Sequence, residues 1–174
     1  MAKQGGRGIL SRSGDGTMTV VAEINGRERR MRVDPGDSLL DALRREGFKG
    51  AKRGCETGDC GSCTVLLDGK PVLSCLIFAA QAHGRKLTTI EGLGTPTRPH
   101  PIQEAFVEAG AVQCGYCIPG MVLVAKSLLD ENPEPDEGAV RHALDGNLCR
   151  CTGYVKQVDA VLLAARKLRG QRKG

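Results

Sequence analysis

Eight cysteines, gathered in two groups, dominate the sequence of this 174-residue chain. The first group begins in GCETGDCGSC, residues 54–63, which holds three cysteines, three glycines and almost no apolar side chain. The second group comprises QCGYC at 113–117 and CRC at 149–151. Segments with so little apolar surface cannot be ordered by hydrophobic burial. Their conformation must therefore depend on whatever the thiols bind.

The rest of the chain indicates a cytoplasmic protein whose thiols serve as ligands. No apolar run is long enough to span a membrane, and the N-terminus lacks the apolar segment of a signal peptide. Thiols are kept reduced in the cytoplasm. We therefore expect the eight cysteines to bind metal rather than to form disulfides.

The charge and the aromatic content argue against nucleic-acid binding. The net charge of +5 comes largely from the arginines of residues 27–32 and from the basic C-terminal tail. Only five aromatic residues are present, two Tyr and three Phe, with no Trp. Binding to single-stranded nucleic acid needs aromatic surfaces beside positive charge. Solvated basic surfaces are expected instead, and docking to an acidic protein partner remains open.

Residues 17–91 show the pattern of a small α+β domain. The stretches MTVVAEI and RERRMRV flank Asn25-Gly26, a type I′ turn signal, and TVLL and KPVLSCLI flank Asp68-Gly69. A short helix between these hairpins is expected to begin at Ser38, and KLTTIE at 86–91 supplies a fifth strand. The pattern predicts a sheet that covers one helix.

The second half of the chain has a different period. Residues 92–101, GLGTPTRPHP, are dense in Gly and Pro and are interpreted as a linker. Apolar residues then recur at helical spacing over 102–168, which predicts an all-α domain of four helices. Residues 1–16 form an N-terminal extension, and 169–174 form a basic tail.

The first cysteine set has the spacing of plant-type [2Fe–2S] ligands. It consists of Cys55, Cys60, Cys63 and Cys75. A two-residue turn at 68–69 places residue 63 opposite residue 74, so Cys75 returns to about one residue from Cys63. Zinc ligands more often form two short pairs, so a zinc site fits this set poorly. Disulfides are the other alternative.

The second set consists of two short pairs, Cys114-x2-Cys117 and Cys149-x-Cys151. Both pairs directly precede predicted helices, at 118–130 and 152–168. The positive end of a helix favours thiolates and an anionic centre. CGYC also resembles a thioredoxin-like redox pair, but that motif needs a βαβ setting. Spacing alone leaves zinc open here, since Cys-x-Cys is not a standard cluster pattern.

Four motifs together resemble one known family. GCETGDCGSCTVLLDG, SC at 74–75, QCGYCIPGM and GNLCRCTGY, in this order, are similar to the iron–sulfur subunit of the molybdenum hydroxylases, the xanthine dehydrogenase family. The resemblance covers residues 17 to 168. It implies an α+β fold class: an N-terminal β-grasp plant-type ferredoxin domain followed by an all-α four-helix [2Fe–2S]-binding domain. Each domain would hold one [2Fe–2S] cluster.

The resemblance also implies the role of the chain and its partners. The chain would be the electron-transfer subunit of an oxidoreductase, without substrate turnover of its own. A large subunit would bind molybdopterin and a medium subunit would bind FAD, in a heterotrimer or its dimer. Carried over from the family, Gln113 and Cys151 would lie against the pterin. The chain departs from the family pattern at Ser62 and Ile118, neither of which is a ligand.

Two other kinds of protein contain similar motifs. A freestanding ferredoxin would act alone and would usually be acidic, whereas this chain is basic and has a second helical domain. A zinc-stabilised interaction module would be colourless. The sequence shows no P-loop and no GxGxxG after a strand, so no nucleotide or flavin site is expected in this chain.

Overall fold

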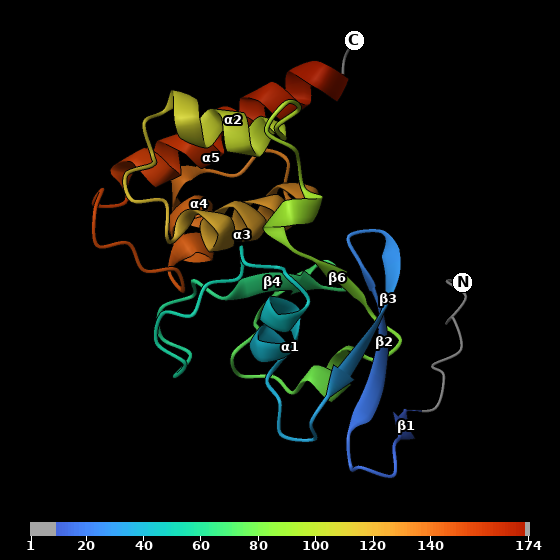
Figure 1. Cartoon of the computed structure of the whole chain (residues 1–174). Coiled ribbons are helices and arrows are strands. Elements are labelled where there is room, and N and C mark those ends of the chain that lie inside the picture. Colours follow the sequence, from blue (N-terminus) through green and yellow to red (C-terminus); the bar gives the residue numbers. More distant parts are fainter. Residues whose placement is uncertain (1–9, 173–174) are drawn as a thin grey trace.

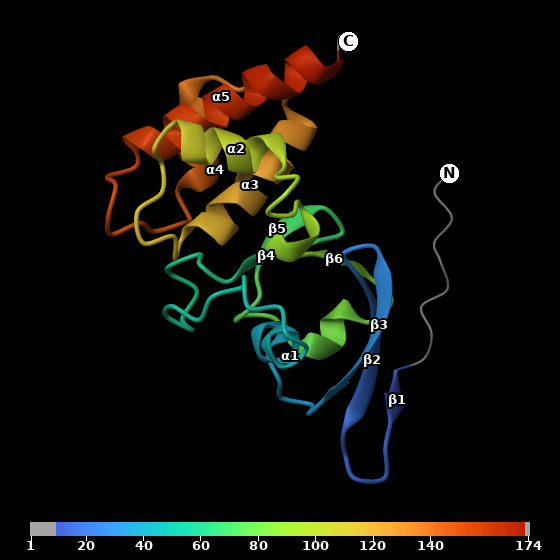
Figure 2. The same ribbon diagram turned by 45° about the horizontal axis from the view of Figure 1, so that its top comes forward.

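Two separate hydrophobic cores organise the chain, one under a β-sheet and one among helices (Figures 1 and 2). The structure is a computed structural model that describes residues 10–172. Most of the predicted N-terminal extension, residues 1–9, lies outside the described residues, as do residues 173–174 of the predicted basic tail.

The sheet begins with the predicted hairpin of β2 (Met18–Ile24) and β3 (Arg27–Val33). Asn25 and Gly26 have φ angles of 52° and 77°, as a type I′ turn requires. Alternate residues of β2 are buried in the core, which is the period expected of a half-buried strand. A further short strand, β1 (Ser11–Arg12), pairs with the start of β2. Sequence had assigned no structure to this part of the extension.

The second predicted hairpin contains β4 (Thr64–Leu67) and β5 (Lys70–Leu73). All four residues of β4 are buried, because the sheet core lies on one side and a helix covers the other (Figure 1). A strand that is covered on both faces is apolar along its whole length, as Val65, Leu66 and Leu67 are.

The last strand in sequence, β6 (Lys86–Thr88), lies in the middle of the sheet. It runs parallel to β2 and antiparallel to β4, so it joins the two hairpins. The strand is shorter than the predicted 86–91. Asn25 ends it, because its side chain accepts a hydrogen bond from the Thr89 N–H and donates one to Thr89 Oγ1, each at 2.9 Å. Residues Ile90–Gly92 then form a 3₁₀ turn.

Helix α1 (Leu39–Arg45) packs against the sheet and completes a β-grasp fold. Ser38 caps it by accepting a 3.1 Å hydrogen bond from the Asp41 N–H, and Gly47 follows it with φ of 92°. Four of its seven residues are buried in the sheet core: Leu39, Leu40, Ala42 and Leu43. The α+β fold class predicted from sequence is confirmed.

Four helices form the second core, as predicted. They are α2 (Pro101–Glu108), α3 (Ile118–Glu131), α4 (Glu137–Leu144) and α5 (Val155–Arg172). The fourth prediction, 152–168, was wrong at its start, because Gly153 and Tyr154 both have φ of 72° and cannot continue a helix. Among residues 10–172, no helix is both long and apolar enough to cross a membrane.

Besides the packing of α3 against β4, the two parts meet through polar contacts of the loop at 146–148, in which Asn147 is buried. Asn147, which follows α4, donates from Nδ2 to the Gly61 carbonyl at 2.9 Å. The next residue, Leu148, donates its backbone N–H to the Cys60 carbonyl at 2.9 Å. Contact is so close that a Cβ on Gly61 would lie 2.1 Å from the carbonyl oxygen of Gly146. The loop at 60–61 and the loop at 146–148 therefore form one joint.

We expect Asn147→Ala to destabilise this joint. The change removes one donor to the Gly61 carbonyl, which still accepts from the Thr64 hydroxyl and N–H, so the loss of this hydrogen bond should cost about 0.5–1.5 kcal/mol. Thermal unfolding of the full chain should shift to lower temperature and broaden as the two cores uncouple. Asn132→Ala is the matched control, because Asn132 is exposed and its side chain accepts only a local hydrogen bond from Glu134. Equal shifts for both variants would contradict a special role for Asn147.

Candidate metal centres

The first cysteine set converges where the loop at 54–63 meets the β4–β5 hairpin. The Sγ atoms of Cys63 and Cys75 lie 3.4 Å apart. This proximity follows from the hairpin register, which pairs Thr64 with Leu73 and so brings the flanking cysteines together. The Cys60 N–H points at Cys55 Sγ at 3.4 Å. The structure thus brings together the four thiols that sequence grouped.

The loop that carries three of these thiols has an unusual backbone. Glu56 and Gly58 have φ angles of 63° and 89°, in the left-handed region. For Glu56 this conformation is unfavourable, and the Arg53 guanidinium pairs with its carboxylate. A Cβ on Gly54 would lie 2.6 Å from Cys60 Sγ, so only glycine lets the backbone pass this close to the thiol.

The thiols of the first centre differ in acidity. Hydrogen bonds from Thr57, together with the Cys60 N–H, lower the pKa of Cys55 to about 6. Burial, reinforced by the neighbouring Cys63 thiol, raises the pKa of Cys75 to about 11. Cys55 is therefore a thiolate at neutral pH, whereas Cys75 must lose a proton when it binds a metal.

The second set converges beside the start of α3. Cys117 directly precedes this helix, and Cys114 lies 3.6 Å from Cys151, measured between Sγ atoms. Cys149 and Cys151 had been predicted to lie directly before α5. The structure shows otherwise, because α5 begins at Val155. A turn at 152–154 intervenes, held by the 2.9 Å hydrogen bond from the Cys149 N–H to the Tyr154 hydroxyl. The helix-end argument therefore applies to one pair only.

The acidity of the second set is also uneven. Burial raises the pKa of Cys117 to about 12, and its neighbour Cys149 adds to the effect. Burial acts in the same direction on Cys149, but hydrogen bonds from Thr152 and the Cys151 N–H outweigh it and lower that pKa to about 7. The hydrogen bond with Cys114 raises the pKa of Cys151.

The thiol distances fit pairs of thiolates on a metal better than a disulfide. A disulfide is about 2.05 Å long, far shorter than the observed 3.4 and 3.6 Å. Two thiolates on one tetrahedral metal, at bonds of about 2.3 Å, lie about 3.8 Å apart. Among residues 10–172, no three Cys, His, Asp or Glu side chains converge on a single-ion site. Four thiols in each set is the number of thiolates that the two irons of a [2Fe–2S] cluster share.

Gln113 and Cys151, the two residues that the resemblance placed against a pterin, both lie at the surface. Gln113 is exposed in the loop between α2 and α3, beside the exposed Cys114. Cys151 is also exposed, whereas Cys117 is buried. The second centre therefore opens to solvent on the side that carries Gln113 and Cys151.

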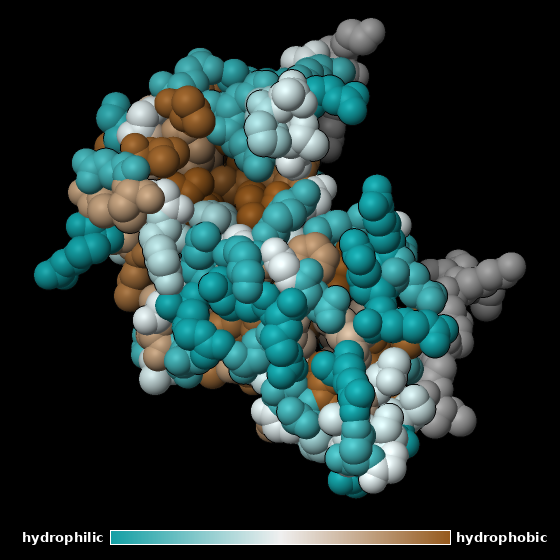
Figure 3. All heavy atoms as spheres, in the orientation of Figure 1, coloured by the Kyte–Doolittle hydropathy of each residue, from teal (hydrophilic) through white to brown (hydrophobic). Residues whose placement is uncertain are grey.

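Exposed apolar side chains lie next to the cysteines of the second set along the sequence. Val112, Tyr116, Leu148 and Val155 flank the four cysteines and are 39% to 57% exposed. Figure 3 shows apolar residues gathered on the helical half of the visible face, while hydrophilic residues cover most of the sheet half. We refer to these four residues as the apolar rim. An apolar surface at an open metal centre is typical of an interface with another protein.

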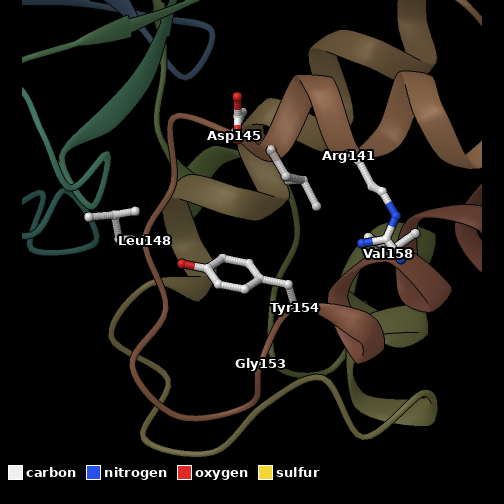
Figure 4. Close-up of a pocket in the computed structure, with 7 residues that line it drawn as sticks. Arg141, Asp145, Leu148, Gly153, Tyr154 and Val158 are labelled. Carbon is white, nitrogen blue, oxygen red and sulfur yellow. The ribbon is translucent and has the colours of Figure 1, made fainter.

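A pocket of about 470 Å³ lies between α4 and the start of α5. The Tyr154 ring stands in it, with Leu148 on one side and Val158 and Arg141 on the other (Figure 4). Because the Tyr154 hydroxyl binds the Cys149 backbone, this pocket adjoins the second centre.

Several residues around the centres were missed from sequence. Asn147 and Gln157 are buried polar residues to which the sequence assigned no role, although Asn147 lies in the GNLCRCTGY motif, two residues before Cys149. The histidines have structural roles where contacts are seen: His100 Nδ1 caps α2, and His83 Nδ1 accepts the Val21 N–H.

Two family models match the chain in succession. A 2Fe-2S iron-sulfur cluster binding domain matches residues 22–87, and a [2Fe-2S] binding domain matches residues 89–162. Together they span both centres.

Similar proteins and structures agree with this pair of domains. The nicotinate dehydrogenase small FeS subunit of Eubacterium barkeri is 46% identical over 151 residues, which cover 86% of this chain and 96% of that protein. The xanthine dehydrogenase iron-sulfur-binding subunit of Escherichia coli O157:H7 is 40% identical over 148 residues, 84% of this chain and 93% of its own length.

Among solved structures, quinoline 2-oxidoreductase from Pseudomonas putida 86 has a chain that superposes with a TM-score of 0.85 at 45% identity. The match covers 89% of this chain and 98% of that one. Aldehyde oxidoreductase from Desulfovibrio desulfuricans matches equally well, at 46% identity and a TM-score of 0.85, but only 17% of its longer chain is covered. With its two iron–sulfur domains in this order, the chain belongs to the iron–sulfur subunits of the molybdenum hydroxylases, the xanthine dehydrogenase family.

Proposed function

We propose that this chain relays electrons between a molybdopterin centre on one partner subunit and a flavin or other acceptor on another. The observation that carries the proposal is the pair of four-thiol centres, joined by the hydrogen bond from the Leu148 N–H to the Cys60 carbonyl. Residues 17–91 and 102–168 would act as the two cluster-binding domains. When bound, two [2Fe–2S] clusters would supply one-electron transfer.

The cysteines would divide between the clusters as their convergence suggests. Cys55, Cys60, Cys63 and Cys75 would bind the first, and Cys114, Cys117, Cys149 and Cys151 the second. The protein would hold each set at a constant geometry and direct N–H groups at the sulfurs, as the Cys60 and Cys151 amides do at 3.4 Å. Such donors stabilise negative charge on a cluster and adjust its reduction potential.

The joint between the two parts would set the separation of the centres. Cys60 is a ligand of the first centre, and its carbonyl is bound by the residue that precedes Cys149. The route from one ligand to the other is therefore a few covalent bonds and one hydrogen bond. Such a short connection is what a relay between two centres needs.

The large molybdopterin-binding subunit would dock at the apolar rim, where the second centre is open. Gln113 and Cys151 would contact the pterin there, and a medium subunit would bind FAD, giving a heterotrimer or its dimer. The cytoplasm, where thiols remain reduced, suits eight cysteine ligands. The relatives include iron–sulfur subunits of nicotinate and xanthine dehydrogenases, which supports substrate oxidation on a partner chain.

The first test is the metal content of the chain purified without oxygen. We expect about four iron and four sulfide per chain, since each cluster contains two of each. The protein should be red-brown, and partial reduction should give two distinct paramagnetic signals. A colourless protein with one or two zinc ions per chain would end this proposal.

The two centres should be separable by mutation. Cys60→Ser should remove or alter the signal of the first centre and spare the second, because the ligands of the two sets lie in different cores. Cys117→Ser should have the opposite effect. Electron paramagnetic resonance and iron analysis of the two variants provide the measurement. If either variant lost both signals while it stayed folded, the division of the ligands would be wrong.

The role of Gln113 can be tested in the assembled enzyme. Gln113→Ala removes an amide that would bind a buried polar group of the pterin, which should cost about 1–3 kcal/mol. Both clusters should remain, while molybdenum content falls or substrate reduces the second centre more slowly. Gln171→Ala, at the exposed end of α5, is the matched control. Values equal to the control in all measurements would assign Gln113 to the surface alone.

A further inference from the structure

A fully buried side-chain amide lies next to the second centre, and its oxygen has no hydrogen-bond partner. Gln157, in the first turn of α5, has 0% exposure. Its Oε1 is the one buried side-chain polar atom without a hydrogen-bond partner among the described residues. An unpaired amide oxygen in an apolar interior is unfavourable. Packing alone would favour an apolar side chain at this position, since Val158, Ala160 and Val161 around it belong to the core.

The other end of the amide is directed at a proposed cluster ligand. Gln157 Nε2 lies 3.6 Å from Cys149 Sγ, within hydrogen-bonding range for sulfur, and 3.4 Å from the Ala111 carbonyl. It also contacts the Thr152 hydroxyl. The amide therefore faces the protein side of the second centre, opposite the exposed side where Cys151 lies. No substrate or pterin could reach it there, because it is buried.

A donor in this position has a definite electrostatic effect. Reduction adds one negative charge to a cluster, and part of that charge resides on the thiolate sulfurs. An N–H directed at such a sulfur stabilises the reduced state more than the oxidised state, so it raises the reduction potential. The low dielectric of a buried site makes the effect larger than at the surface.

We propose that Gln157 raises the reduction potential of the second centre by donating an amide hydrogen to Cys149 Sγ. The proposal rests on the proposed function, since it requires a cluster on Cys149. Gln157 is a positioning residue that acts through this ligand and does not touch substrate. This role explains why a buried amide with an unpaired oxygen is present at this position. The side chain is needed for the N–H that Nε2 donates to Cys149 Sγ, and not for the stability of the core.

The test uses the full chain with both clusters and the variant Gln157→Leu, which keeps the approximate volume without a donor. The midpoint potential of each centre is measured in a redox titration followed by electron paramagnetic resonance. We expect the second centre to become harder to reduce by a factor of about three to ten, which corresponds to about 30–60 mV at 59 mV per tenfold for one electron. The first centre, in the other core, serves as the internal control.

Two further measurements separate tuning from packing. Without iron, Gln157→Leu should change the unfolding temperature little, because it removes the unpaired oxygen together with the donor to the Ala111 carbonyl. Val161→Ala, one turn along α5, should lower the unfolding temperature and leave both potentials unchanged. Gln157→Met repeats the test with a flexible side chain, should Leu pack poorly.

The outcomes are distinct. Unchanged potentials in both Gln157 variants, with both clusters present, would overturn the tuning role and leave the proposed function intact. Loss of the second cluster in both variants, with the chain folded, would also overturn it, since Gln157 would then be needed to retain the cluster. A wild-type chain that binds no iron would remove both proposals together.

Discussion

Each centre must hold four thiols within a few ångströms, although thiolates repel one another. In the sheet half, the repulsion is opposed by a loop whose backbone N–H groups turn inward and by a hairpin that cannot slip. The Cys63–Cys75 distance of 3.4 Å is a direct consequence of that hairpin register. In the helical half, the start of α3 and a tight turn before α5 hold the thiols together against this repulsion. Iron bound at each centre would supply the positive charge that completes the arrangement.

The remaining structure holds these two polar sites at a constant separation. Each lies at the edge of its own hydrophobic core, and the cores do not merge. Where the halves meet, β4 is covered by α3, and the loop at 146–148 binds the loop at 60–61. A polar joint of this kind depends on hydrogen-bond direction, so it allows less sliding than an apolar contact would. Separation of the centres is thereby defined more sharply than by packing alone.

The features that could be predicted from the sequence are those that depend on residues close together in the chain. Turn residues such as Asn25-Gly26 and the cap at Ser38 require particular backbone conformations, so both hairpins and α1 could be recognised. The thiol spacing indicated the two sets because short spacings restrict which sulfurs can share a metal. Both the pairing of Cys63 with Cys75 and the four helices follow from patterns of this kind.

Features that depend on tertiary contacts could not be predicted in the same way. The end of β6 is set by Asn25, more than sixty residues earlier, and the late start of α5 reflects the bond between Tyr154 and Cys149. Gln157 occupies a core position of an amphipathic helix, where its neighbours would suggest an ordinary apolar site. Its significance becomes visible only when Cys149 is placed beside it.

The position of β6 also bears on how the chain is made. This strand is the last in sequence but lies at the centre of the sheet, between β2 and β4. All four cysteines of the first centre precede it, and a ribosome delivers about 5–20 residues per second. During synthesis, the nascent chain therefore presents its first four thiols, with the β4–β5 hairpin able to form locally, before the sheet can close. The protein passes through an interval in which this metal site is open to whatever loads it and its sheet edges are unprotected.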